Sequence, residues 1–420
     1  MPTADAYKEV APWTTAQPSG RLPRDAWWTL YGDMRLNALQ DKLIAGNPDL
    51  ATALANYDHA RAYANTVDGE AGYELDLWHR IRNNVASGNA PAAVSSADLK
   101  SARLSLSAQL ADAYVVLRGF DRDSALLEDM VKICRFALDL AIDRHDGSIA
   151  TGLDIAGAQA QLEAACAQAA QTLAQRTLVE RAIVALAGES ASHFSITPQI
   201  VDIGLPRVPT GIPSTLLQRR PDIAAERRRV EAATAALGVA CASSYFPSVA
   251  LNPLGGKQSA RNAGWMTAPN SYWAVGPSMP LAMVDAGKRK AQAAEALAAL
   301  EEASARYRGV ALTAFQEVED NLALLDHHRD AWQAGVAAAE AAQRSPDFSM
   351  DRCREGAVNY LDVAASQTAA LQAQRDALAL ETLQLRASVA LIRALGGGWE
   401  SPSAHQSVLA DTRRRLHAYA

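Results

Sequence analysis

Few residues of this chain are placed to perform chemistry. The adjacent pair His327 and His328 stands in a charged helical stretch without a matching acidic or cysteine set, which favours a solvated pair over a metal site. No GxSxG, HExxH or phosphate loop followed by Lys-Ser/Thr is present. The cysteines form no CxxC pair, and their Ala-rich surroundings are typical of small buried hydrophobic residues; they are Cys134, Cys166, Cys241 and Cys353. We therefore predict no enzyme activity, no metal and no cofactor.

Charge and hydropathy exclude further classes of protein. The formal net charge is −6, from 46 acidic and 40 basic side chains. This mild excess lacks the clustered basic face of a nucleic-acid-binding protein, so no nucleic-acid partner is predicted. No run of about 18 apolar residues occurs, so no transmembrane helix is expected. The first nine residues have neither a basic start nor an apolar stretch, and no export signal is predicted in the sequence as given.

One segment occurs twice, 208 positions apart. Residues 143–155 align with residues 351–363, and each copy lies between long Ala-, Leu- and Gln-rich stretches. This pattern predicts a long helix, a short reversal and a second long helix, repeated once. Each hairpin would expose an apolar stripe that has to be buried against the other hairpin or another subunit. Such a protein is more typically a rod or a tube than a catalytic globule.

Prolines separate these helices. None occurs from residue 92 to 197 or from 282 to 345, and because proline disrupts helix interiors, we predict long helices over about 95–144 and 286–344. Pro346 is expected to kink or end the second of these helices. Pro221 suits the first position of a helix. The intervening prolines predict an irregular connector; they are Pro198, Pro206, Pro209 and Pro213.

The two reversals resemble helix ends. Gly147 and Gly356 can adopt the left-handed conformation that stops a helix. Asp154 and Asp362 fall in the first turn of the returning helices, where a carboxylate complements the helix dipole. An equally open interpretation is that these aspartates are helix caps and nothing more. Gly396-Gly397-Gly398 is better explained as a C-terminal helix stop than as a phosphate loop.

Alternating side chains predict strands near the middle of the chain. The larger apolar residues are Val249 and Leu251 in one run, and Trp273, Val275, Met279 and Leu281 in another. Period-two alternation with aromatic residues nearby is typical of a lipid-facing barrel strand, although a soluble hairpin would show a similar pattern. The stretch from Asn252 to Asn270 between the runs is predicted to be an exposed loop.

Five further motifs stand out along the chain: Gly211-Ile-Pro-Ser-Thr-Leu-Leu-Gln-Arg-Arg-Pro-Asp-Ile223, Tyr245-Phe-Pro-Ser248, Trp27-Trp28, Thr313-Ala-Phe-Gln-Glu-Val-Glu-Asp320 and Ala394-Leu-Gly-Gly-Gly-Trp399. Together they resemble the outer-membrane efflux protein family, in its TolC-, OprM- and NodT-like branch. The resemblance implies a mainly α-helical chain whose long hairpins form a trimeric helical barrel, with β-hairpins contributing to a small outer-membrane β-barrel. It also implies a passive duct for drugs and small molecules, working with a periplasmic adaptor and an inner-membrane RND pump.

The resemblance also implies roles for particular residues. The gate at the periplasmic end would comprise Leu361, Asp362 and Ala365, with alanine at a position where related channels often carry a further aspartate. The tips that meet the adaptor would comprise Gly147, Ser148, Thr151, Gly152, Leu153, Glu355, Gly356, Asn359 and Tyr360. Outer-membrane lipid would contact the alternating apolar residues of the two strands named above.

We predict four segments: a first repeat (1–190), a proline-rich connector (191–220), a second repeat with a β-hairpin at 243–284 (221–400), and a C-terminal tail (401–420). The first repeat departs from the family, because only about eleven residues separate the helix ending near Val67 from Trp78. One membrane-crossing strand needs about 9–11 residues, so most of the first β-hairpin is expected to be missing. The lipid-bearing cysteine of this branch is also absent from the sequence as given. The alternative function is therefore a degenerate, non-channel coiled-coil paralogue that only associates with adaptors or sibling subunits.

Overall fold

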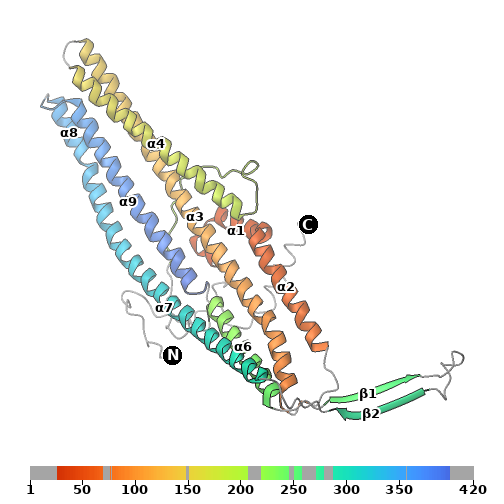
Figure 1. Ribbon diagram of the computed structural model, residues 1–420. Helices are drawn as coiled ribbons and strands as arrows, with labels where there is room; N and C mark the ends of the chain where they lie inside the picture. The colour runs from red at the N-terminus through yellow and green to blue at the C-terminus, as the bar shows by residue number, and fades with distance from the viewer. Residues whose placement is uncertain are drawn as a thin grey trace. The chain divides into compact units, whose positions relative to one another are not determined.

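The computed structural model describes residues 26–69, 76, 78–147, 151–206, 219–245, 250–257, 271–278, 287–355 and 357–397 (Figure 1). Helices make up most of these residues. The elements are η1 (Trp27–Tyr31), α1 (Met34–Gly46), α2 (Pro48–Gly69), α3 (Arg80–Asp146), α4 (Gly152–Leu186), α6 (Pro221–Tyr245), β1 (Ala250–Lys257), β2 (Ser271–Ser278), α7 (Lys288–Gln343), α8 (Ser345–Arg354) and α9 (Tyr360–Ala394). Within the described residues, no helix combines the length and apolarity needed to cross a bilayer.

The chain forms two compact units, and each unit draws on both halves of the sequence. Unit 1 comprises Thr52–Ser101 and Leu217–Thr313, and it contains α6 and the two strands. Unit 2 comprises Pro2–Ala51, Ala102–Leu216 and Ala314–Ala420, and it contains α4, α8 and α9. The boundaries between the two units cross α2, α3 and α7. The four sequence segments stay a prediction.

The two long helices were predicted with different success. α7 closely matches the expected range, but α3 begins at Arg80, fifteen residues earlier than about 95, and it contains Pro91. Proline inside a helix costs about 3 kcal/mol because one hydrogen bond is lost. Packing against α6 offsets this cost on both sides of Pro91. Gly238 of α6 lies so close to Asn83 that an added Cβ would be 2.4 Å from Nδ2, and Arg229 pairs with Asp98 at 2.8 Å.

Proline and glycine mark boundaries of other helices as predicted. α7 stops at Gln343, and α8 restarts at Ser345 with Pro346 in its first turn. Pro221 is the first residue of α6. After α9, Gly396 and Gly397 have φ values of 87° and 86°, which a side chain would disfavour, so the helix stop is confirmed for these two residues. Gly398 lies outside the described residues.

Strands β1 and β2 form an antiparallel pair in unit 1. The register runs from Ala250 opposite Ser278 to Lys257 opposite Ser271. Leu251, Trp273 and Val275 lie in these strands as predicted; Val249, Met279 and Leu281 lie outside the described residues. The predicted loop was wrong over Asn252–Lys257, which is strand. Pro253 is tolerated because β1 has one partner strand in the described chain, so the missing N–H can fall on the unpaired edge. Residues 243–245 belong to α6 and not to the predicted hairpin.

The short link between α2 and α3 is the region in which most of the first β-hairpin was expected to be missing. Of this link the structure describes Asp76, Trp78 and His79. Asp76 holds the start of α3, because its carboxylate accepts hydrogen bonds from Ile81 N (3.0 Å) and Arg82 Nε (2.8 Å). The bond from Arg82 lowers the pKa of the Asp76 carboxyl.

Unit 2 is built on a narrow seam between α3 and α4. The buried residues of α4 include Ala158, Ala165 and Thr172, at seven-residue intervals, as in a coiled coil. Ala165 packs with Leu127 and Cys134 of α3 in the hydrophobic core. Cys134 is buried as predicted, whereas the other three cysteines are half-buried; all four are free thiols.

The C-terminal end of α4 is fixed against α1. Asn47 Nδ2 donates to Leu186 O at 2.9 Å. Gly188, with a φ of 74°, lies so close to Gly46 that an added Cβ would be 2.0 Å from its carbonyl oxygen. A glycine is therefore required at position 188 by both its conformation and its neighbour.

Candidate functional site at the helical reversals

The first reversal joins α3 to α4. Thr151 is the N-cap of α4, and Asp154 is three residues later. The Asp154 carboxylate accepts hydrogen bonds from Thr151 N and Thr151 Oγ1, both at 2.8 Å, and Asp154 N donates to Thr151 Oγ1 at 3.4 Å. These reciprocal bonds form a capping box, which satisfies backbone donors that the helix itself leaves unpaired. The bonds from Thr151 lower the pKa of the Asp154 carboxyl.

The second reversal repeats this arrangement. Asn359 is the N-cap of α9, and its N–H donates to Asp362 Oδ2 at 3.1 Å to form a capping box. Thr151 and Asn359 are 208 positions apart, as are Asp154 and Asp362. The prediction that both aspartates stabilise the starts of the returning helices is confirmed. Asp362 already serves as a cap, whatever further role it has.

The outgoing ends of the reversals differ from the prediction. Gly147 N donates to Asp143 O at 3.1 Å, which continues the helical pattern of α3. The described glycines with positive φ are Gly32, Gly188, Gly287, Gly396 and Gly397, so the left-handed conformation predicted for Gly147 is wrong. The helical hydrogen-bonding pattern of α3 thus extends to Gly147, and residues 148–150 lie outside the described residues. Ser148 and Gly356 lie outside the described residues.

The predicted tip and gate residues differ in their exposure. Leu153 is 81% exposed at the start of α4, so a large apolar side chain is presented to solvent in one chain. On α9, Leu361 is half-buried, and Asp362 and Ala365 are exposed. Ala365 therefore does not pack in a helical seam within one chain. Of the other predicted tip residues, Gly152 and Glu355 are exposed, whereas Tyr360 is half-buried.

Contacts between the two hairpins begin next to the reversals. Arg144 Nη1 of α3 donates to Asn359 Oδ1. The rings of Phe136 and Tyr360 meet edge to face, with centroids 5.4 Å apart. Burial raises the pKa of the Tyr360 hydroxyl. The structure thus places the second capping box directly against the last turns of α3.

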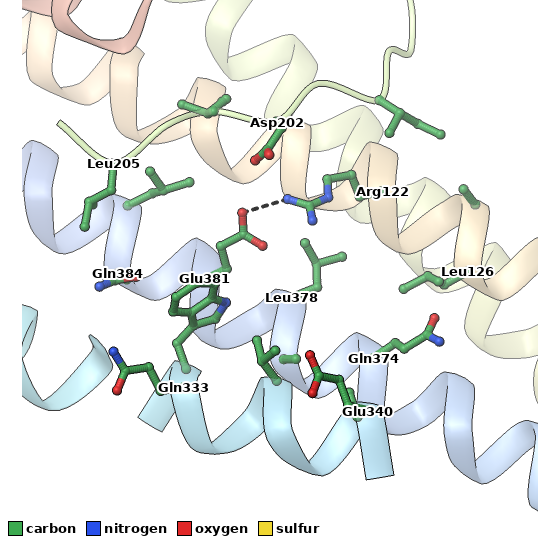
Figure 2. Close-up of a pocket in the computed structure, with 18 of the residues that line it drawn as sticks. Arg122, Leu126, Asp202, Leu205, Gln333, Glu340, Gln374, Leu378, Glu381 and Gln384 are labelled. Atoms are coloured by element: carbon green, nitrogen blue, oxygen red, sulfur yellow. Dashed lines mark hydrogen bonds and ion pairs between the residues drawn. The ribbon is translucent and has the colours of Figure 1, made fainter. Parts of the chain in front are cut away.

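Three further ion pairs join α3 to α9 along their length. Arg375 contacts Asp123 through two hydrogen bonds, of 2.6 and 3.2 Å, and both side chains are 17% exposed. Arg122 Nη1 lies 2.9 Å from Glu381 Oε1 (Figure 2). Arg386 forms two bonds to Asp112, of 2.8 and 3.1 Å, and this pairing raises the pKa of its guanidinium. We call these three pairs the inter-hairpin ties.

A cavity of about 830 Å³ lies beside the Arg122–Glu381 tie. Side chains from α3, α7, α9 and residues 200–205 line it, and Figure 2 shows Asp202, Gln333 and Glu340 around this space. Apolar residues, including Trp332 and Leu378, contribute to the same walls. The exposed lining of the cavity is mainly apolar, with acidic groups and amides among the residues around it. In the part of the chain that is described, no group of three or more acidic, histidine or cysteine side chains is placed to hold a metal ion.

A buried charge cluster fixes the connector to the first hairpin. Asp121 accepts from Arg118 Nη1 at 2.7 Å and from Arg176 Nε at 2.6 Å, and all three residues are less than 10% exposed. Arg176 Nη2 donates to Ile196 O at 2.8 Å, and Gln199 N donates to Asp121 Oδ2 at 3.1 Å. Because buried charges have to be paired, this cluster defines where the connector lies on α3 and α4.

Comparison with known proteins shows to which family a chain with these paired hairpins belongs. A profile of the family described as outer membrane efflux protein matches residues 65–189 and 212–397. The chain belongs to the outer membrane efflux protein family. Its members include the outer membrane protein OprJ of Pseudomonas aeruginosa, which is 30% identical over 330 residues, covering 78% of this chain and 69% of OprJ.

Other relatives extend the similarity to nearly the whole chain. The pyoverdine export outer membrane protein OpmQ of Pseudomonas aeruginosa is 28% identical, with 89% of this chain and 88% of OpmQ covered. The solved structure of the outer-membrane channel OprN superimposes with a TM-score of 0.86 at 28% identity, covering 95% of this chain and 98% of that one. The chain is thus a homologue of outer-membrane efflux channels, and its location is the outer membrane and periplasm.

The inter-hairpin ties and the buried cluster were not predicted from the sequence. Asp123 and Arg375 are separated by 252 positions, and neither residue lies in a motif. Arginine and aspartate are also the ordinary residues of a solvated helix surface. Only the capping signature, a cap residue followed three residues later by an acidic residue, could be recognised from residues close together in the sequence.

Proposed function

We propose that this protein is the outer-membrane exit duct of a tripartite efflux system. An inner-membrane RND pump supplies the energy, a periplasmic adaptor connects the pump to the duct, and drugs or other small molecules pass through passively. Membership of the efflux family supports this assignment, as do the functions for which relatives are named, which include antibiotic and toluene efflux. A wide duct contacts its cargo loosely, so selectivity is expected in the pump.

The observation that carries the proposal is the unburied flank of each hairpin in unit 2. Outside its narrow seam α4 is largely exposed, and Leu173 and Leu178 are 52% and 65% exposed. Leu324 of α7 is 45% exposed. Large apolar residues on helix flanks are stabilised when another subunit covers them. We propose a homotrimer in which these flanks meet, burying more than about 2,000 Å².

The reversals would form the periplasmic end of the duct. Leu361 would form an apolar constriction and Asp362 an acidic ring, while Ala365 leaves the position one turn further along α9 without charge. The exposed tips, with Leu153 foremost, would meet the hairpins of the adaptor. The paired strands β1 and β2 would contribute to the membrane barrel, with Trp273, 81% exposed, facing lipid.

Single-channel conductance of the purified protein in a planar bilayer tests the proposal. The protein is expected to conduct. Light scattering in detergent should give the mass of a trimer. A stable oligomer that never conducts, yet still crosslinks to an adaptor, would support the alternative of a non-channel coiled-coil paralogue. A protein that remains monomeric at micromolar concentration would contradict the trimer itself.

A further inference from the structure

Five basic residues gather at the end of unit 1 that carries the β-hairpin. Arg80 and Arg82 open α3, and Lys288, Arg289 and Lys290 open α7. We call these residues the basic cluster. Their helices converge there: Gly238 of α6 packs against Asn83 of α3, and Ser244 Oγ near the end of α6 donates to Arg289 O at 3.0 Å. Figure 1 shows the start of α3, the end of α6 and the start of α7 at the base of β1 and β2.

This placement of positive charge opposes the preference of the helices. The N-terminus of a helix carries a partial positive charge, which favours acidic side chains and disfavours lysine and arginine. α7 has no acidic residue in its first turn, whereas at the start of α3 the Asp76 carboxylate already accepts a hydrogen bond from Ile81 N. The first turn of a helix also directs backbone N–H groups outward, so an anion at this place would gain from both the side chains and the backbone.

Part of the basic cluster is exposed to solvent. Asp76 pairs with Arg82 at 2.8 Å, and this arginine remains 68% exposed. Lys288 and Lys290 are exposed to solvent. The residue Trp78, 43% exposed, lies two positions before Arg80. Tryptophan beside lysine and arginine is the composition found where a protein meets the membrane–water interface.

The position of the hairpin base indicates which anion is concerned. The base is the pair Ala250–Ser278, five residues after the end of α6 and ten residues before the start of α7. We propose that the basic cluster binds anionic phospholipid headgroups of the leaflet that faces the periplasm. The inference rests on the proposed function, since it requires β1 and β2 to enter the membrane. Lipid is favoured over a soluble anion because the cluster lies where the strands emerge.

Binding of POPG, compared with POPC, to the full-length protein in dodecyl maltoside tests this inference by native mass spectrometry. The variant Lys288→Gln/Lys290→Gln removes two charges and keeps residues of high helix propensity. Each basic residue near an anionic surface contributes about fivefold to binding, so the POPG affinity should fall about 30-fold. The matched control Lys132→Gln/Arg135→Gln removes two exposed charges from unit 2 and should bind POPG like the wild type.

The outcomes distinguish recognition of the lipid headgroup from binding of acyl chains or of a free anion. Preference for POPG that weakens with added salt, as exposed charge interactions do, and that inorganic phosphate does not displace, would support the inference. Equal binding of POPG and POPC, or equal POPG binding by the lysine variant and the wild type, would overturn it. Circular dichroism verifies that each variant is folded. Because lipid binding is measured without conductance, a channel that conducts without preferring POPG refutes only this inference, and a POPG-binding protein that never conducts refutes only the proposed function.

Discussion

The Asp123–Arg375 tie should hold the two hairpins together, and breaking it should favour an open periplasmic end. We consider Asp123→Asn, Arg375→Gln and the double variant. Both side chains are 17% exposed and share two charge-assisted hydrogen bonds, at 2.6 and 3.2 Å. Bonds of this kind contribute about 1.5–3 kcal/mol in proteins.

The surroundings moderate the penalty for removing one partner. Arg375 also donates to the side-chain oxygens of Gln168 and Gln372, at 2.9 and 3.1 Å, and Asp123 accepts from Thr172 Oγ1 at 3.1 Å. Neither charge would be left without a partner, so the loss should be less than the 3–5 kcal/mol typical of a broken buried pair. We expect a coupling energy of about 2 kcal/mol, which is about 30-fold in an equilibrium constant.

The assay is a double-mutant cycle read in two ways, as the thermal midpoint in detergent and as open probability in a planar bilayer. The pair Asp112 and Arg386 provides a matched control, because its side chains are 36% and 45% exposed. Exposed pairs contribute less than about 1 kcal/mol, so Asp112→Asn should change the open probability less than about fivefold.

Two results would refute this reasoning. A coupling energy below about 0.5 kcal/mol would show that the tie does not hold the hairpins together. A coupling near 2 kcal/mol in the thermal midpoint, with an unchanged open probability, would show that the tie stabilises the fold without restraining the periplasmic end.

Three other perturbations test separate features of the structure. Gly188→Ala should destabilise the protein by more than about 2 kcal/mol, because the new side chain would meet both a positive φ and a backbone clash. At Gly157 an added Cβ meets nothing within 4 Å, so the control Gly157→Ala should raise the thermal midpoint instead. The pKa of the Asp154 carboxyl is lowered in the folded state, so its contribution to folding stability is fully present above the unfolded pKa of 3.8 and is lost as pH falls through the lower folded pKa. The difference in stability between wild type and Asp154→Asn, measured by thermal melts, should therefore shrink below pH 3.8. A difference that is constant with pH would contradict the capping role. In the proposed trimer, Ala365→Asp should bring three carboxylates together and make the open probability sensitive to divalent cations. A conductance trace unaffected by the substitution would remove position 365 from the proposed gate.

The sequence was informative where a structure is determined by neighbouring residues. A cap followed by an aspartate three positions later, as at Thr151 and Asn359, is decided within one helical turn. Pro221 and Pro346 act through their own rings and also needed no distant information. The gaps between prolines and the segment repeated after 208 positions were sufficient to predict the long helices and the two hairpins, apart from the first fifteen residues of α3.

Packing decided the features that were missed. Pro91 stays within α3 because α6 holds the helix on both sides of it, and no local signal records that contact. Pro253 lies in β1 of the described two-stranded pair, and whether a strand tolerates proline depends on how its edges are paired, which no local signal records. The tie between Asp123 and Arg375 forms only when α9 is aligned with α3 in one particular register. A single sequence does not show how the two helices are aligned.

The seam of α4 has a mechanical consequence for the first hairpin. Ala158, Ala165 and Thr172 are small, and the buried bulky side chains around Ala165, which are Leu127 and Met130, come from α3. Toward the connector end, the polar contact of Arg176 with Asp121 also fixes the alignment of α3 and α4. At the other end, Arg144 of α3 contacts Asn359 at the start of α9. The first hairpin is therefore restrained at both ends, so a movement of Leu153 would require the second hairpin to move with it or the contact with Asn359 to break.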